Sequence, residues 1–207
     1  MYMPAFEKLE KADKEGVLKI IRSTKQKLGW LRKKMEHPDY NNCETMVSPS
    51  DLVVYKCERD FLNLAITKYI KLGGEYKEPK ISIRDTKFND RLEDISKITF
   101  YNGGFFSTDV KIVVDLLGDK PRFSSGTFNG LNEKETDIEK EDFLYHLGEL
   151  HMGEWRCHYS PERFGIVVCD GEEWVLKIEY KDGRKKTFSG MNAYPYNFDA
   201  LLELLCL

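Results

Sequence analysis

The residues in this chain whose types could hold a metal ion gather between residues 151 and 169. His151, Cys157, His158 and Cys169 lie within nineteen residues of one another. A structural zinc site needs paired ligands, usually about two to four residues apart, twice over. Neither C-x-x-C nor H-x-x-x-H occurs, and adjacent residues of an extended chain point to opposite sides. The sequence therefore favours surface histidines and buried thiols over a metal site, and it implies no cofactor.

Motifs for nucleophilic catalysis and for phosphate-binding loops are missing from the sequence. It contains no G-x-S-x-G elbow, and Gly103-Gly104 lacks the remainder of the G-x-x-x-x-G-K pattern. Carboxylate pairs such as Glu93-Asp94 occur in charged turns. No catalytic residue is assigned, and a non-enzymatic function is favoured.

One group of aromatic and polar residues is unusual, and it occupies the C-terminal third of the chain. A scaffold interpretation makes the two tryptophans core anchors, with loop asparagines that cap a turn or tie the loop down. In this interpretation Asp170-Gly171 is a hairpin turn and Gly190 adopts a positive φ angle. A functional interpretation makes the group a polar-aromatic pocket for a ligand or partner. The residues that would line it are Trp155, Tyr159, Asp170, Trp174, Asn192, Tyr194 and Asn197.

At these residues the chain resembles a family of uncharacterised bacterial proteins, mostly from Firmicutes and their mobile elements. The family carries a W…Y…D-G-x-x-W…G-S-N-x-Y-P-x-N-F signature before a short terminal helix. The resemblance covers roughly residues 142–205 and, more loosely, the region of Gly103-Gly104-Phe105, and Met191 stands where the signature has Ser. No activity is attached to the family, so the resemblance implies a shared fold and domain extent only.

Charge is distributed unevenly along a chain whose formal net charge is only -3. Ten Lys or Arg oppose five acids between Glu7 and Glu36, whereas seven acids oppose two Lys between Glu133 and Glu149. Solvated helix faces are the simplest explanation, and partner-binding faces are the alternative. The residues that would contact a partner are Arg22, Lys25, Arg32 and Lys33 on the basic face and Glu135, Asp137 and Glu139 on the acidic face.

Cysteine usage and hydropathy bear on the compartment. The five cysteines are odd in number and irregularly spaced, which is typical of reduced thiols rather than of a disulfide framework. No apolar run approaches the length of about 18 residues that a membrane span requires. We therefore expect a cytoplasmic protein without a membrane partner.

Hydrophobic periodicity predicts a helical hairpin over residues 1–75. Its first helix covers residues 16–36, and its second begins at Ser48-Pro49-Ser50-Asp51 and ends at Gly73-Gly74. Residues 76–94 are polar and contain a proline, which predicts a linker with a short strand at Ile81-Ser82-Ile83.

Residues 95–207 are predicted to form an antiparallel-sheet domain. The clearest signal is a meander in which strands at 165–169, 174–180 and 184–188 are joined by turns at Asp170-Gly171 and Asp182-Gly183. Helices over residues 136–150 and 196–205 would cover the sheet. The predicted fold class is therefore α+β, with a helical N-terminal hairpin and a meander of five to six strands covered by two helices.

Three functions remain open at this point. We expect a non-enzymatic interaction protein that binds a protein or protein–nucleic-acid partner. An inhibitor of a nucleic-acid-handling defence effector, such as a CRISPR nuclease, encoded by a phage or mobile element, is one example. The second function is a small-ligand or enzymatic domain with a pocket near Asn192 and Tyr194. The third is direct nucleic-acid binding by the basic first helix, where Trp30 could stack on bases.

Overall fold

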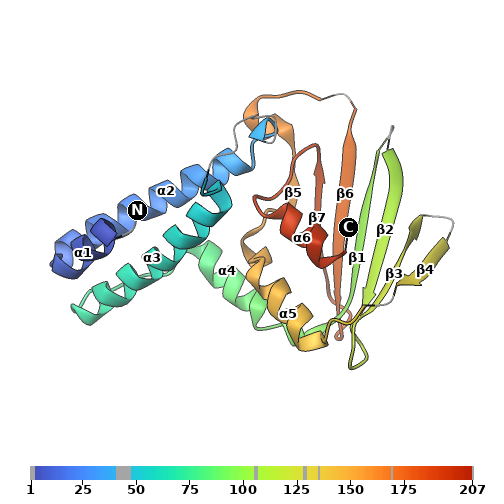
Figure 1. Cartoon of the computed structure of the whole chain (residues 1–207), viewed down its shortest axis with the longest axis horizontal. Helices are drawn as coiled ribbons and strands as arrows, with labels where there is room; N and C mark the ends of the chain where they lie inside the picture. The colour runs from blue at the N-terminus through green and yellow to red at the C-terminus, as the bar shows by residue number, and fades with distance from the viewer. Residues whose placement is uncertain are drawn as a thin grey trace. The chain divides into compact units, whose positions relative to one another are not determined.

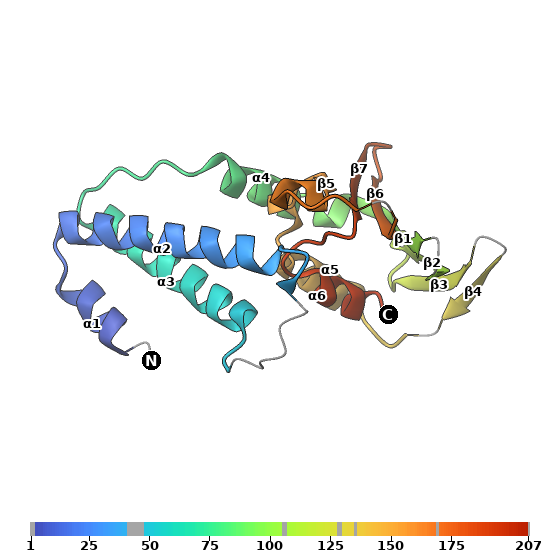
Figure 2. The same cartoon turned by 90° about the horizontal axis from the view of Figure 1, so that it is seen from above.

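The computed structural model describes residues 3–40, 48–104, 107–127, 130–134, 136–168 and 170–206. The chain forms two compact units, Met1–Glu78 and Pro79–Leu207. The first unit is helical and the second is built around a sheet, as Figures 1 and 2 show. This arrangement confirms an α+β chain with a helical N-terminal part.

The first unit contains the helices α1 (Met3–Lys11), α2 (Lys14–Met35) and α3 (Asp51–Lys71). Local sequence signals fix where the two long helices begin, because Asp13 and Ser50 accept hydrogen bonds from the backbone N–H groups of Gly16 and Val53. Gly73, at a φ of 73°, follows the end of α3. The predicted helical hairpin is therefore present, and α1 is a helix that the sequence analysis missed.

The hairpin is held together by a small apolar core and by ion pairs between its helices. Val17 and Ile21 of α2 are buried in one cluster with Phe61 and Ala65 of α3. Lys27 Nζ lies 2.6 Å from Glu58 Oε1, and Lys34 Nζ lies 2.7 Å from Asp51 Oδ2. The apolar stripes of α2 and α3 thus pack mainly on each other.

The second unit contains a seven-stranded sheet among its described residues, in the order β4-β3-β2-β1-β6-β7-β5. Neighbouring strands are antiparallel except β5 and β7, which pair in parallel. The strands are β1 (Ile95–Gly104), β2 (Ser107–Asp115), β3 (Arg122–Thr127), β4 (Gly130–Lys134), β5 (His158–Tyr159), β6 (Glu172–Tyr180) and β7 (Lys185–Met191).

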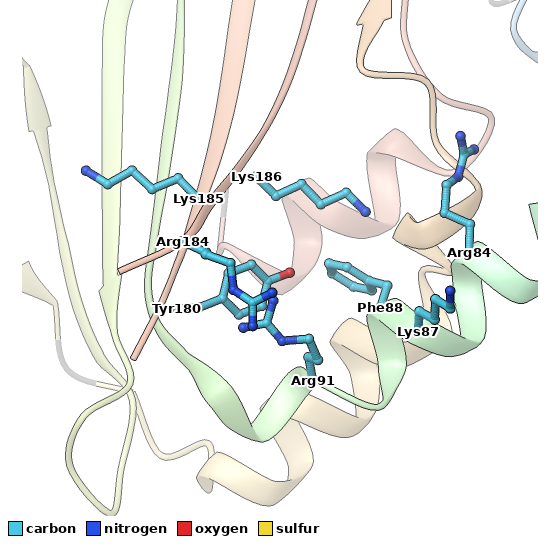
Figure 3. A pocket seen from close by; sticks show the side chains of 8 residues that line it. All are labelled: Arg84, Lys87, Phe88, Arg91, Tyr180, Arg184, Lys185 and Lys186. Atoms are coloured by element: carbon cyan, nitrogen blue, oxygen red, sulfur yellow. The ribbon is translucent and has the colours of Figure 1, made fainter. Parts of the chain in front are cut away.

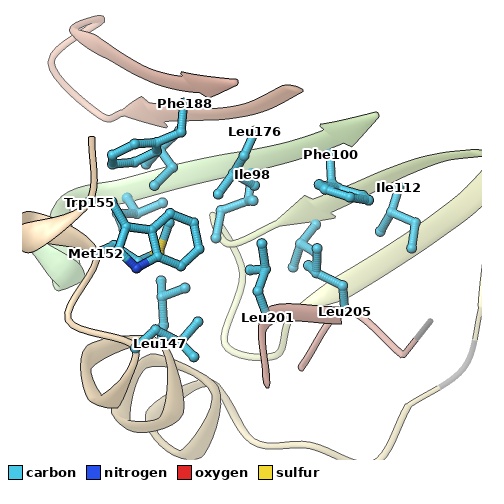
Figure 4. Close-up of a cluster of buried hydrophobic side chains, with 14 of the residues drawn as sticks. Ile98, Phe100, Ile112, Leu147, Met152, Trp155, Leu176, Phe188, Leu201 and Leu205 are labelled. Atoms are coloured by element: carbon cyan, nitrogen blue, oxygen red, sulfur yellow. The ribbon is translucent and has the colours of Figure 1, made fainter. Parts of the chain in front are cut away.

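Helices cover one face of this sheet. The helices of the unit are α4 (Lys80–Asn89), α5 (Lys140–Glu149) and α6 (Phe198–Leu204), with the 3-10 turns η2 (Leu92–Asp94), η3 (Met152–Glu154) and η4 (Pro161–Phe164). Leu147 of α5 and Leu201 of α6 lie over sheet residues such as Phe100, which Figure 4 shows. Alternate residues of β6 from Trp174 to Tyr180 are buried in the same core, as the sequence pattern predicts.

The predicted linker over residues 76–94 is wrong from residue 80 onward. Residues 80–89 form helix α4, and the predicted short strand at 81–83 lies within it. Ile81 and Ile83, which suggested a strand, are exposed, whereas Asp85 and Phe88 of the same helix are buried. Tertiary packing on one helix face has therefore overridden a short apolar alternation.

The predicted strand order also needs correction. Residues 165–168 form no strand, and Val167 is among the most exposed apolar side chains that the structure describes. Instead β6 pairs with β1 on one side and β7 on the other, so Asp170-Gly171 is not a hairpin turn. The described sheet has seven strands rather than five or six, and α4 joins α5 and α6 in its core through Phe88.

Candidate functional site

The polar-aromatic residues that the sequence singled out come together mainly as a packed cluster in the core. Trp155 and Trp174 are almost completely buried and meet edge to face at 6.5 Å between ring centroids. The ring of Tyr194 stacks on Trp174 at 6.5 Å, and Phe198 lies 4.8 Å from Trp174. Tyr159 is buried beside Trp174, at 6.0 Å. Such contacts supply stability through buried aromatic area.

The polar atoms of this cluster are used within the protein. Trp155 Nε1 donates to Asn197 Oδ1 at 3.1 Å, and Asn197 Nδ2 donates to the carbonyl of Leu150 at 2.7 Å. Trp174 Nε1 donates to the carbonyl of Ala193 at 2.9 Å. Buried polar groups need such partners, so these bonds explain why an asparagine and two indoles are tolerated in the core.

Asn192 ties the loop after β7 to the start of β6. It adopts a φ of 47°, accepts from the backbone N–H of Glu172 at 2.9 Å and donates to the carbonyl of Asp170 at 3.1 Å. Tyr194 donates to Glu172 Oε2 at 3.3 Å, and burial followed by the Glu172 charge raises the pKa of Tyr194 to about 12. Asn192, rather than Gly190, takes the positive φ angle.

The scaffold role of these residues is therefore visible in their contacts. Gly190 is required for space, because a Cβ there would meet the indole of Trp174. The Asp170 side chain makes no hydrogen bond or ion pair within the described residues, and the residue is exposed. Ligand binding at this cluster stays a prediction.

The basic residues predicted as a partner surface lie on α2. Arg22 and Lys33 are exposed, and Trp30 beside them is 60% exposed. Lys25 Nζ instead lies over the ring of Tyr76 at 4.6 Å, and Arg32 pairs with Glu36 at 2.9 Å. Two of the four predicted cations are thus engaged inside the unit.

The acidic residues predicted as a partner surface precede α5. Asp137 and Glu139 are exposed, and Glu139 pairs with Lys120. Glu135 lies outside the described residues. The acidic surface is therefore partly neutralised by a lysine of the same unit.

A cationic pocket, which the sequence analysis did not predict, opens between α4 and the β6–β7 hairpin. Its volume is about 340 Å³, and it is shown in Figure 3. The unit as a whole carries seventeen Lys or Arg against twenty-three Asp or Glu, so a gathering of cations here runs against its net charge. Six of the eight lining residues are basic. The lining residues are Arg84, Lys87, Phe88, Arg91, Tyr180, Arg184, Lys185 and Lys186.

Arg84 fastens α4 to the turn η3 and so fixes one wall of the pocket. Its Nε donates to the carbonyl of Gly153 at 2.5 Å, and its Nη2 donates to the carbonyls of Glu154 and Trp155 at 3.0 and 3.1 Å. Gly153 permits this approach, because a Cβ there would collide with the backbone of Asp85. Asp85 also pairs with His151 at 2.8 Å.

The outer end of the cationic pocket is largely neutralised by a carboxylate. Asp182 Oδ2 lies 2.8 Å from Arg91 Nη2 and 2.6 Å from Arg184 Nη2. The hydrogen bonds from Arg184 hold the pKa of Asp182 below its usual range. The Arg91 guanidinium lies 3.9 Å above the ring of Tyr180. Arg91 and Arg184 are therefore already paired within the unit.

The inner end of the cationic pocket, formed by Arg84, Lys87 and Lys186, is different. These three cations have no ion-pair partner among the described residues. Lys186 Nζ lies 4.5 Å from the ring centroid of Phe88 and 5.0 Å from that of Phe188. Burial, and then the charge of Arg84, lowers the pKa of Lys186. The Asp85 charge acts on Lys186 in the opposite direction but forms no ion pair with it, so this end of the pocket keeps positive charge that suits an anion.

The signal for this pocket was present in the sequence but divided between distant segments. Arg84, Lys87 and Arg91 recur at helical spacing, and a basic run covers residues 184–186. The first set fell in the predicted linker, and the second set adjoined a hairpin turn. Only the tertiary fold, which places Phe88 of α4 beside Lys186 of β7, brings the two sets together.

Comparisons with known proteins give no match to a family model, to a curated protein or to a solved structure. The family resemblance of the C-terminal signature therefore stays a prediction. None of the described helices has the length and apolarity needed to cross a membrane. Within the described residues, no three His, Cys, Asp or Glu side chains are grouped so that they could hold a metal ion.

Proposed function

We propose that this protein is a non-enzymatic binding protein for nucleic acid and that its cationic pocket contacts phosphate groups. The observation that carries the proposal is the gathering of six basic residues at one pocket of a net acidic unit. Basic side chains that neutralise phosphates supply most of the sequence-independent affinity for nucleic acid. Asp182 already neutralises the arginines of the outer end, so the inner end supplies the main contact with phosphate.

The chemistry of the pocket fits phosphate better than a neutral ligand. Phe88 and Tyr180 are buried and serve as floor for the cations rather than as stacking surfaces. The pocket therefore contacts the phosphates of a strand and not the edges of its bases, which predicts binding without sequence preference.

A second surface, on the first unit considered by itself, supports the same proposal. Trp30 of α2 exposes most of its ring, and Lys34 Nζ lies 5.5 Å from the ring centroid. Arg22 and Lys33 of the same helix are exposed and have no ion-pair partner among the described residues. Aromatic rings beside cations are the usual contact surface for single-stranded nucleic acid. This is the direct binding by the basic helix that the sequence predicted as an alternative.

Binding of a protein partner, including inhibition of a nucleic-acid-handling effector, stays a prediction. Binding assays with the purified protein and free nucleic acid, without an effector, separate the two functions. A protein that binds only an effector and no free nucleic acid would contradict the proposal made here.

The proposal is tested with fluorescently labelled single-stranded DNA and RNA of about 20 nucleotides, by anisotropy across a salt series. We expect the logarithm of the association constant to fall linearly with the logarithm of the salt concentration. The slope of this line should be about -0.7 for each phosphate contacted on a single strand. The double variant Lys87→Gln, Lys186→Gln removes two cations of the inner end, so the slope is expected to shrink by about one to one and a half.

The matched control is Lys97→Gln, Lys111→Gln, which removes the same charge from β1 and β2. Lys97 and Lys111 alternate with the buried residues Ile98 and Ile112, so they lie on the opposite face of the sheet. An equal loss of affinity in both double variants would show unspecific attraction and contradict a site at the pocket. Absence of any salt-dependent binding would overturn the proposed function itself.

A further inference from the structure

We propose that the inner end of the cationic pocket binds a terminal phosphate of a nucleic-acid strand in preference to an internal phosphodiester. The inference deepens the proposed function and rests on it. Arg84, Lys87 and Lys186 are the residues that would hold this group, and they line the pocket from α4 and β7 together with Phe88 (Figure 3).

The first argument is the match of charge. An internal phosphodiester carries one negative charge, whereas a terminal phosphate carries between about 1.5 and 2 near pH 7. The inner end presents three cations without carboxylate partners among the described residues, whereas Asp182 already pairs with both arginines of the outer end. The unpaired cations of the inner end therefore favour a terminal phosphate over an internal phosphodiester.

The second argument is the match of donors to oxygens. A terminal phosphate offers three free oxygens, and a phosphodiester offers two. Arg84 uses Nε and Nη2 on the carbonyls of residues 153–155, which leaves Nη1 without a hydrogen-bond partner among the described residues. Lys87 and Lys186 each add an ammonium group, so three side chains can each donate to one oxygen.

The third argument is the partly buried state of Lys186. Its side chain extends toward Phe88 and Arg84, whereas its neighbour Lys185 extends in the opposite direction, as Figure 3 shows. An ammonium group placed among aromatic rings and beside another cation has lost hydration without gaining a full counter-charge. An anion at this position restores that counter-charge, and a dianion restores more of it.

The experiment compares two oligonucleotides of one sequence, one with a 5′-phosphate and one with a 5′-hydroxyl group, labelled at the 3′ end. We expect the phosphorylated strand to bind at least about tenfold more tightly, which corresponds to one strong charge-assisted contact. Lys186→Met is expected to abolish this difference between the two strands. Lys185→Met is the matched control on the adjacent residue and is expected to preserve it.

The possible results separate this inference from the proposed function. Equal, salt-dependent binding of both strands would overturn recognition of the end and leave nucleic-acid binding intact. No binding of either strand would overturn both proposals. A nucleoside 5′-monophosphate that competes as strongly as the phosphorylated strand would show a site for small phosphate compounds and overturn recognition of a strand end.

Discussion

Two regions at opposite ends of β6 differ in how their polar groups are satisfied. At its start, Trp174 belongs to an aromatic cluster in which the polar atoms of Trp155, Trp174 and Asn197 bond to other groups of the protein. At its end, Tyr180 lines a pocket where three cations have no carboxylate partner among the described residues. The aromatic cluster thus has the contacts of a scaffold, whereas the segment predicted as a linker contributes cations to the lining of a pocket. Unusual residue types alone do not distinguish a site from a core, and the pairing state of the charged groups separates these two regions.

The largest expected effect falls on the aromatic cluster. Trp174→Ala removes a fully buried indole that contacts Tyr159, Tyr194 and Phe198, so it should cost about 3–5 kcal/mol of unfolding free energy. Chemical denaturation measures the loss. A variant that keeps full stability but loses a ligand response would show that this region is a site, and the contrast between the two regions would fail.

Arg84 links the two regions, and its loss should have the next largest effect. Arg84→Ala removes three hydrogen bonds to the carbonyls of residues 153–155, which should cost about 2 kcal/mol of unfolding free energy. Lys87→Ala, one turn along the same helix face, should change stability by less than about 0.5 kcal/mol. Equal stability of the two variants would contradict the fastening role of Arg84.

Asn192 tests the scaffold role of the C-terminal loop. Asn192→Ala removes bonds to Glu172 and Asp170 and places alanine at a φ of 47°, so we expect a loss of about 1–2 kcal/mol of unfolding free energy. Asn192→Gly removes the same bonds without the backbone strain, and it should cost less. Oligonucleotide affinity should be unchanged in both folded variants. Lost affinity with retained stability would move the functional site to this loop.

The smallest expected effect is on the pH dependence of stability. Lys186 has a pKa lowered from the ordinary 10.5, so the unfolded state binds more protons than the folded state between these two pKa values. Stability should therefore rise with pH across that window, and this rise should be missing in Lys186→Met. The groups that face Lys186 are Arg84, Asp85 and Cys157. Urea unfolding at several alkaline pH values measures the difference between the two proteins, and identical pH slopes would contradict the lowered pKa.

Ligand binding and this pH effect are linked through the same residue. A bound anion stabilises the charged form of Lys186, so strand binding should raise its pKa and take up a proton at alkaline pH. The two regions would then differ in one more respect, because strand binding at the pocket should not change the protonation of the aromatic cluster.

Local signals in the sequence predicted much of the fold. The N-terminal helical hairpin follows from apolar residues at helical spacing and from the start signal of the second helix around Ser50. The alternating burial from Trp174 to Tyr180 and the positive φ of Gly183 follow from the same kind of local pattern. Such features depend on residues close in sequence, so one segment contains all the information that they need.

Features decided by distant contacts could not be predicted in this way. Whether β6 pairs with residues 165–169 or with β1 depends on contacts between distant strands, and no local sequence pattern determines that choice. The segment 80–89 is short and polar, so its own sequence gives little support to a helix. It forms one because its buried side packs on η3 and the sheet.

The sequence by itself determined the α+β class, the helical N-terminal part and the alternating burial along β6. Only the tertiary structure decided which charges remain without partners. The physical reason is that an ion pair or a burial cost depends on distance in space, and Arg84 and Lys186 are about a hundred residues apart in the chain but interact across the cationic pocket. The candidate site is therefore a property of the folded unit rather than of any one segment.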